Sequence, residues 1–216
     1  MGELLPDLIH SELNFKNGFY IEAGANDGIR QSNTLYLEKN LGWKGILIEP
    51  NIKKMELCKK HRSSLNIFHS CAISPDETIN CMTGNFNEDC GGESLMACSS
   101  SLLELDYYDE IVKNEIIQKI KTREQISVSA KTLNSILKEN NIIHVDFLSL
   151  DLEGYEFEAL KNFNFNEFNI NYILIETSSR PLYQEIIHSF MKSKGYIYYD
   201  KISNNDDLFK NENCLY

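Results

Sequence analysis

The stretch FYIEAGANDGIRQSNTLYLEKNLGWKGILIEPN, residues 19–51, decides the fold. It opens with a short apolar run at 19–23 that ends at a glycine cluster, and a second apolar run at 45–49 is closed by Pro50. An amphipathic segment at 31–40 separates the two runs. Short apolar runs that are bounded by Gly or Pro and separated by helical patterns are typical of a parallel β-sheet with helices on both faces.

The same alternation continues toward the C-terminus, except in one segment. The further predicted elements are helices at 51–62, 132–140, 155–162 and 181–194, and strands at 66–73, 126–130, 145–150, 171–176, 195–200 and 207–210. Residues 78–125 lack this order apart from a helical pattern at 102–121, so we expect an insertion or lid there. The pattern predicts an α/β fold and a single domain over residues 1–216, with an antiparallel last strand from the C-terminal hairpin.

Length and charge set limits on the class of protein. A chain of 216 residues suits one domain with its own core. Its 21 Lys and Arg residues against 32 Asp and Glu residues give a net charge of −11, whereas nucleic-acid binding proteins normally present a basic surface. No apolar run approaches the roughly 20 residues of a membrane helix. The start, MGELLPDLIH, lacks the pattern of a signal peptide, so we expect a cytoplasmic protein.

A glycine-rich loop follows the first predicted strand, and an acid ends the second. Gly24 and Gly28 lie in AGANDG, where the lack of side chains lets the backbone approach a ligand closely. Glu49 follows Gly28 by 21 residues, in the place from which a carboxylate can accept hydrogen bonds from the hydroxyls of a ribose. Loop and acid together predict a cofactor that contains a nucleoside, although the glycines alone could serve a tight turn.

Two cofactors fit that description, a nicotinamide dinucleotide and S-adenosylmethionine. Asn26 stands where a dinucleotide-binding loop has its second glycine. Glu22 and Asp27 place negative charge beside the loop, which is unfavourable for a pyrophosphate and favourable for an ammonium and a sulfonium. We therefore expect S-adenosylmethionine, with the nicotinamide cofactor as the alternative.

The stretch at 19–51 resembles the N-terminal signature of the FkbM-like methyltransferases, and VDFLSLDLEGYEFEALKNF at 145–163 resembles their second signature. The resemblance covers about residues 18–177. It implies the Rossmann-like class I methyltransferase fold with a mostly parallel, seven-stranded sheet, and the use of S-adenosyl-L-methionine. It also implies cofactor-binding positions at Glu22, Gly24, Ala25, Asn26, Asp27, Gly28, Ser32, Asn33, Thr34, Glu49, Pro50, Ala72, Ile73 and Asp151.

The second signature carries two acids, Asp151 and Glu153, directly after a predicted strand. A hydroxyl acceptor must lose a proton during methyl transfer, and a carboxylate close to it can take that proton. Residues two apart on an extended stretch share one face, so we expect both acids at the acceptor. The structural alternative is that Asp151 caps the following helix and Glu153 faces solvent.

A metal site is a weaker alternative for the same acids. Glu176, at the end of the next strand, could add a third carboxylate ligand for a divalent cation. No His completes such a site, and the six cysteines include no C-x-x-C pair. We therefore expect no metal.

These features predict an S-adenosylmethionine-dependent O-methyltransferase that acts on a hydroxyl of a sugar, glycan or other polyhydroxylated small molecule. The assignment of oxygen as the methylated atom rests on the family resemblance alone, and a nitrogen acceptor stays open. The alternatives are an NAD-dependent oxidoreductase and a non-catalytic cofactor-binding module of the same fold. The expected partners are a small-molecule or glycan acceptor and neither nucleic acid nor membrane, and a homodimer stays open.

Overall fold

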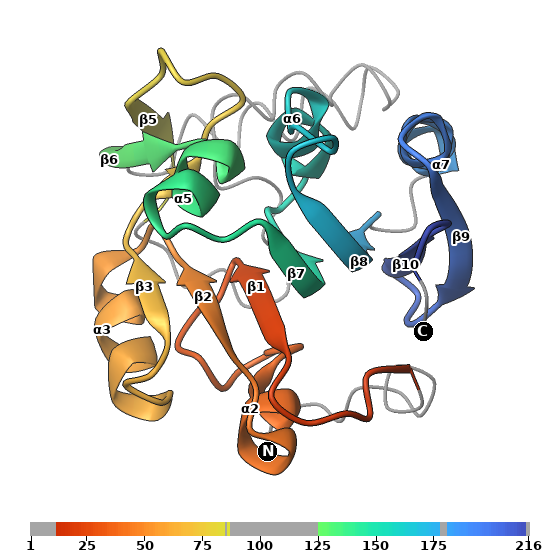
Figure 1. The fold of residues 1–216 in the computed structure, drawn as a ribbon. Coiled ribbons are helices and arrows are strands. Elements are labelled where there is room, and N and C mark those ends of the chain that lie inside the picture. Colours follow the sequence, from red (N-terminus) through yellow and green to blue (C-terminus); the bar gives the residue numbers. More distant parts are fainter. Residues whose placement is uncertain (1–11, 85, 87–124, 178–180, 215–216) are drawn as a thin grey trace.

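Seven strands form the central sheet, in the order β3-β2-β1-β7-β8-β10-β9 (Figure 1). The structure, a computed structural model, describes residues 12–84, 86, 125–177 and 181–214. The strands are β1 (Phe19–Ala23), β2 (Lys44–Ile48), β3 (Ile67–His69), β7 (His144–Leu150), β8 (Asn169–Glu176), β9 (Tyr196–Lys201) and β10 (Asp206–Asn211). The sheet confirms the predicted fold class.

Strand direction also agrees with the prediction. The strands β3, β2, β1, β7 and β8 are parallel to one another, whereas β10 runs antiparallel to both β8 and β9. Ala23 pairs with Ile48 on one side and with Leu150 on the other, so β1, β2 and β7 end level with one another. The loops after these strands therefore meet at one edge of the sheet, the carboxyl edge.

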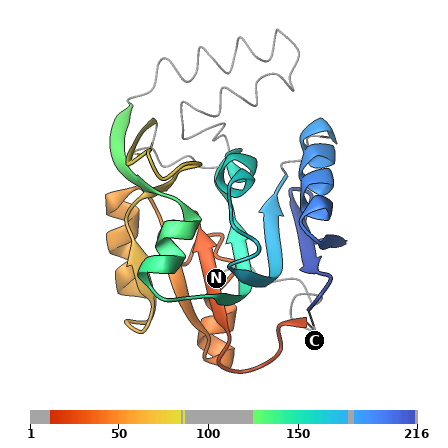
Figure 2. The same ribbon diagram turned by 45° about the horizontal axis from the view of Figure 1, so that its top comes forward.

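Helices cover both faces of the sheet. One face packs on α2 (Leu35–Leu41) and α3 (Ile52–His61), and the other packs on α5 (Leu133–Glu139), α6 (Glu156–Lys161) and α7 (Pro181–Ser193). In Figure 2, α3 stands at the β3 end of the sheet and α7 at the β9 end. Among the described residues no helix is long and apolar enough to cross a membrane, and the longest, α7, has 13 residues.

A small second sheet has the order β4-β6-β5, from β4 (Ala72–Ile73), β5 (Cys81–Gly84) and β6 (Ile126–Lys131). The prediction of one strand over 66–73 is therefore wrong, because β3 joins the main sheet and β4 pairs with β6. The Ser129 hydroxyl donates to the carbonyl of Ser70 at the break (3.0 Å). Residues 87–124, which include the predicted helix at 102–121 and most of the predicted insertion, lie outside the described residues.

Gly45 allows β2 to pack against β1. A Cβ atom at this position would lie 2.1 Å from the backbone oxygen of Tyr20, which cannot move without disturbing the strand pair. We expect Gly45→Ala to lower the free energy of unfolding by about 3 kcal/mol, as overpacked cores do. At Gly195 there is space for a Cβ but φ is +81°, so Gly195→Ala should cost about 1–2 kcal/mol. Urea denaturation compares them, and an equal or smaller loss for Gly45→Ala would contradict the packing argument.

Candidate cofactor and acceptor site

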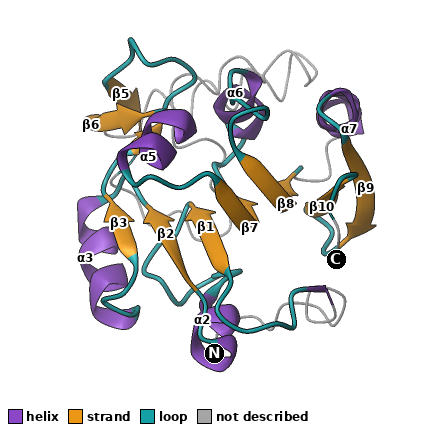
Figure 3. Ribbon diagram, in the orientation of Figure 1, coloured by secondary structure: helices purple, strands orange, loops and turns teal. Residues whose placement is uncertain are grey.

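The carboxyl edge of the sheet brings the predicted site residues together. Gly24, Glu49 and Asp151 directly follow β1, β2 and β7, and the last residue of β1 pairs with the last residues of the other two strands. Figure 3 shows the loops that leave these strands. Ligands of open α/β sheets bind outside this edge, so the sequence prediction and the topology point to the same place.

The first loop is bonded tightly to both neighbouring strands. The backbone N–H groups of Gly24 and Ala25 both donate to the carbonyl of Ile48 (3.0 Å each). Gly24 has φ +90°, and a Cβ there would lie 2.0 Å from the backbone oxygen of Asp151. The backbone N–H of Asp151 in turn donates to Ala23 (3.1 Å). The close approach of two loops therefore requires glycine at position 24, whether or not a ligand is bound.

Glu49, whose contact with a ribose stays a prediction, is held by backbone donors. Its side chain is buried, with the backbone N–H of Asn26 donating to Oε2 (2.9 Å) and that of Asn51 to Oε1 (2.8 Å). Burial raises the pKa of Glu49, although the two backbone donors and the charge of Lys54 oppose the shift. Each carboxylate oxygen has a further lone pair, so Glu49 can still accept hydrogen bonds from ribose hydroxyls.

Asp27 shapes the turn that follows. Its Oδ1 accepts hydrogen bonds from the backbone N–H groups of Ile29 (2.9 Å) and Arg30 (2.8 Å). Burial raises the pKa of the Asp27 carboxyl, but these two bonds and the charges of His61 and Arg30 together hold it below its usual value. Asn26 has φ +49° and Gly28 has φ +80°, so the turn contains several left-handed residues. That Asp27 also faces the cofactor stays a prediction.

Glu22, Ser32 and Thr34 lie beneath the loop rather than on its surface. Glu22 accepts hydrogen bonds from the hydroxyls of Ser32 (3.0 Å) and Thr34 (2.7 Å) and from the backbone N–H of Asn33 (2.7 Å). Thr34 is 0% exposed, so its side chain does not reach the surface. The Asn33 side chain donates to the Ser149 hydroxyl on β7 (3.0 Å). The cofactor contacts predicted at these positions stay predictions, and the buried side chains can act through the shape of the loop.

Asp151 and Glu153 lie on the loop between β7 and α6, and both are partly exposed. Burial raises the pKa of Asp151 well above its usual value, and the negative charges of Glu176 and Glu153 raise it further. The loop is a turn rather than an extended stretch, since Glu153 has φ +54°. The residue that precedes α6 as its cap is Tyr155, so Asp151 does not cap this helix.

A residue outside the sequence prediction, Glu156, fixes that turn. Its carboxylate is fully buried and accepts hydrogen bonds from the backbone N–H groups of Leu152 (2.8 Å) and Gly154 (3.1 Å) and from the Tyr183 hydroxyl (2.9 Å). The signal was present as an acid in the first helical turn after a glycine, a position from which a carboxylate can bond the preceding backbone. No sequence pattern indicated that Tyr183 on α7 would be a partner of Glu156.

The remaining predicted contacts are at Pro50, Ala72 and Ile73. Pro50 follows Glu49 and is half-buried. Ala72 and Ile73 form β4 and are 5% and 3% exposed, paired with β6. The adenine contacts predicted for β4 therefore stay predictions.

The described residues contain no group of three or more His, Cys, Asp or Glu side chains that could hold a metal ion. Glu176 ends β8 and lies close enough to Asp151 to raise the pKa of that carboxyl. The arrangement of Asp151, Glu153 and Glu176 as metal ligands finds no support in this part of the chain.

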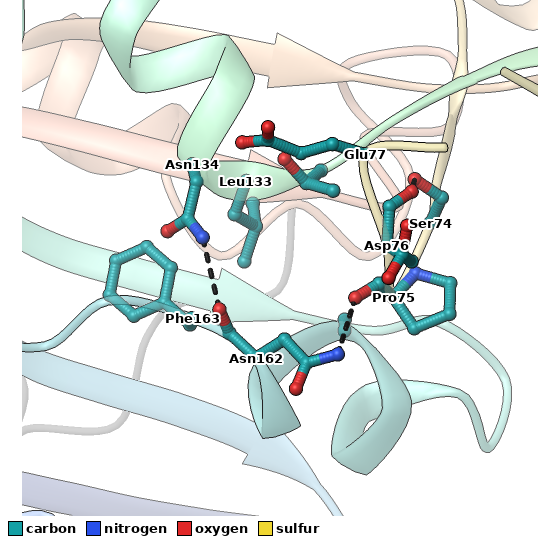
Figure 4. A pocket seen from close by; sticks show the side chains of 10 residues that line it. Ser74, Pro75, Asp76, Glu77, Leu133, Asn134, Asn162 and Phe163 are labelled. Carbon is teal, nitrogen blue, oxygen red and sulfur yellow. Dashed lines mark hydrogen bonds between the residues drawn. The ribbon is translucent and has the colours of Figure 1, made fainter. Parts of the chain in front are cut away.

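A hollow of about 450 Å³ lies between the loop after β4, the start of α5 and the end of α6 (Figure 4). None of the predicted cofactor or catalytic residues lines it. Its amides bond within the protein, since Asn162 donates to the carbonyl of Pro75 (2.9 Å) and Asn134 donates to the carbonyl of Asn162 (3.0 Å). The cofactor position at the carboxyl edge stays a prediction, and the hollow does not include any of its residues.

The family model of the methyltransferase FkbM domain matches residues 22–198. The chain belongs to the FkbM methyltransferase family. Similar solved structures include M. capricolum TrmK in complex with S-adenosyl-homocysteine, with 11% identity, 98% of this chain and 70% of that chain covered, and a TM-score of 0.46. Another is the human methyltransferase 10 domain containing protein, with 12% identity, 94% and 79% covered, and a TM-score of 0.49. No curated protein matches the sequence.

Family membership makes S-adenosylmethionine the cofactor of this FkbM-family chain and rules out the nicotinamide alternative. The charges of the carboxyl edge fit this cofactor. Glu153, Glu156, Glu176 and Asp206 all raise the pKa of Asp151 through repulsion between like charges. A sulfonium and an ammonium placed here would relieve that repulsion.

The raised pKa of Asp151 gives a pH dependence with a defined sign. A carboxyl whose pKa is higher in the folded than in the unfolded state binds more protons when folded, so stability falls as pH rises from its unfolded pKa to its folded pKa. We expect Asp151→Asn to raise the unfolding free energy of the cofactor-free protein above that range and to flatten this pH slope. The same change should weaken S-adenosylhomocysteine binding at neutral pH.

Urea denaturation from pH 4 to 8 and calorimetric titration measure the two effects, with Glu185→Gln on the exposed side of α7 as the matched loss of one charge. A stability slope that Asp151→Asn leaves unchanged would contradict the prediction.

Proposed function

We propose that this FkbM-family chain transfers the methyl group of S-adenosylmethionine to a hydroxyl oxygen of a sugar, a glycan or another polyhydroxylated small molecule. The observation that carries the proposal is the turn with Asp151 and Glu153. This turn lies beside the loop that follows β1, residues 24–34, which we call the cofactor loop. The buried carboxylate of Glu156 accepts hydrogen bonds from the backbone of the turn.

The cofactor supplies a methyl group that its sulfonium already activates, so the oxygen–carbon bond forms as the sulfur–carbon bond breaks and the hydroxyl proton must leave. The chain's own contribution is to orient the hydroxyl and accept this proton. A carboxylate whose pKa is above its ordinary value is a stronger proton acceptor than an ordinary carboxylate, and Asp151 meets this condition. We assign proton acceptance and acceptor orientation to Asp151 and Glu153 as a pair.

The charge at the carboxyl edge supports the substrate class. Carboxylates accept hydrogen bonds from hydroxyl groups, and a polyhydroxylated acceptor offers several such donors. Phosphorylated acceptors and nucleic acids would meet repulsion from Asp151, Glu176 and Asp206, which interact electrostatically at this edge. An amine acceptor would also match these charges, and the product analysis below separates the two. We further propose a single methyltransferase domain over 1–216, with an insertion at about 78–125.

Replacing Glu153 should slow turnover strongly and spare cofactor binding. We expect Glu153→Gln to lower kcat by about 10²–10⁴, the usual contribution of a positioned general base, with little change in the dissociation constant of S-adenosylhomocysteine. The matched control is Glu158→Gln on α6, an acid that pairs with Lys161, and it should retain full activity.

The experiment incubates the wild type with S-adenosylmethionine and panels of sugars, polyols and amines, followed by mass spectrometry of the products. Methylation of a hydroxyl acceptor by the wild type and Glu158→Gln, but not by Glu153→Gln, is the expected result. A product methylated on nitrogen would overturn the oxygen assignment. Cofactor binding with no methylated product in any panel would favour the non-catalytic module.

A further inference from the structure

One buried arginine, Arg62, lies directly beneath the cofactor loop. It follows α3 and is 4% exposed. Its guanidinium donates hydrogen bonds to six partners: Glu38 (2.8 Å), Glu22 (3.1 Å), the Gly28 carbonyl (3.3 Å), Ser32 (3.1 Å), Tyr20 (2.8 Å) and Thr34 (2.8 Å). A Cβ at Gly28 would lie 2.8 Å from Cγ of Arg62, so the stem of the arginine also packs against the loop.

The charge of Arg62 balances two buried acids. Glu22 and Glu38 are 3% and 8% exposed, and each has a carboxylate oxygen within 3.1 Å of the guanidinium. Burial alone would lower the pKa of Arg62, but the charges of these acids keep it raised, so the arginine stays protonated. Removing it would leave two buried carboxylates without a cation, which is strongly destabilising.

The loop that Arg62 supports contains four residues with left-handed backbone. Gly24, Asn26, Gly28 and Gln31 all have positive φ, at 90°, 49°, 80° and 57°. Such left-handed residues persist only where the surroundings over-determine them, and the non-glycine ones carry strain. Five of the six acceptors of Arg62 belong to this loop or to β1, the strand that leads into it.

We propose that Arg62 is a positioning residue for the binding of S-adenosylmethionine. It holds loop 24–34 in the conformation that binds the cofactor and does not contact the cofactor itself. A loop that is ordered before binding spares the ligand the free energy of ordering it, so affinity depends on the support beneath. The proposal uses the cofactor of the family and is independent of the methyl acceptor. Its failure would leave the proposed function standing, and the reverse also holds.

Two hydroxyls of the network provide a matched pair for the test. Thr34 and Tyr20 are both 0% exposed, and both accept a hydrogen bond from the same Nη2 of Arg62 at 2.8 Å. Each also donates to one of the two acids, Thr34 to Glu22 (2.7 Å) and Tyr20 to Glu38 (2.8 Å). Thr34 lies at the end of the cofactor loop, whereas Tyr20 lies near the start of β1, away from that loop.

We expect Thr34→Val to raise the dissociation constant of S-adenosylhomocysteine by about five- to tenfold, the effect of one lost hydrogen bond. Tyr20→Phe should lower the unfolding free energy by the equivalent of a five- to tenfold change in the folding equilibrium constant. It should leave the dissociation constant of S-adenosylhomocysteine at the wild-type value. Calorimetric titration gives the affinities and urea denaturation the stabilities, both at a temperature where circular dichroism shows each variant folded.

Arg62→Lys extends the test, because lysine keeps the charge but lacks the planar fork that reaches several partners at once. If folded, it should weaken binding at least as much as Thr34→Val. Equal losses of affinity in Thr34→Val and Tyr20→Phe would overturn the proposal, since the network would then act through stability alone. Wild-type affinity in Thr34→Val would overturn it as well.

Discussion

The rest of the site depends on the buried ion pairs that Arg62 makes with Glu22 and Glu38. The three residues come from β1, α2 and the end of α3, so one guanidinium joins three elements on one face of the sheet. Burying three charges costs several kcal/mol per ion, which only complete hydrogen bonding offsets. Such a network is therefore a poor source of net stability. Its stronger effect is to permit a single arrangement of its partners, and the cofactor loop is among them.

The same device recurs at the other loops of the carboxyl edge. Glu156 holds the turn between β7 and α6 from within the fold. Asp207, which is 0% exposed, accepts hydrogen bonds from Thr177 (3.2 Å) and Gln184 (2.8 Å), and Nε2 of His188 lies 2.8 Å from it. It thereby joins β10 to the end of β8 and to α7. Glu156 thus bonds the backbone of its turn, and Asp207 bonds side chains of the elements around it, while Asp151 and Glu153 stay partly exposed.

Local patterns predicted the sheet and the place of the site, because apolar period, glycines and strand-end acids are all properties of short segments. These local patterns could not predict the buried network around Arg62. Arg62 ends the run KKHR, which reads as a solvated helix end, and its acid partners are 24 and 40 residues away. Glu156 depends in the same way on Tyr183, 27 residues away. The division of 66–73 likewise follows from pairing with β6, which no pattern within that segment reports.

The acids of the carboxyl edge repel one another, and a bound cation would relieve that repulsion. Without a bound cation, burial and four neighbouring acids oppose the negative charge of Asp151, and this lowers the stability of the folded protein. A sulfonium gains from the same field. Once the methyl group has left, the sulfur is a neutral thioether, so the attraction at that position disappears while the acids remain. With the cofactor in the proposed place, the charge of this edge would favour the sulfonium of S-adenosylmethionine over the neutral thioether of the product.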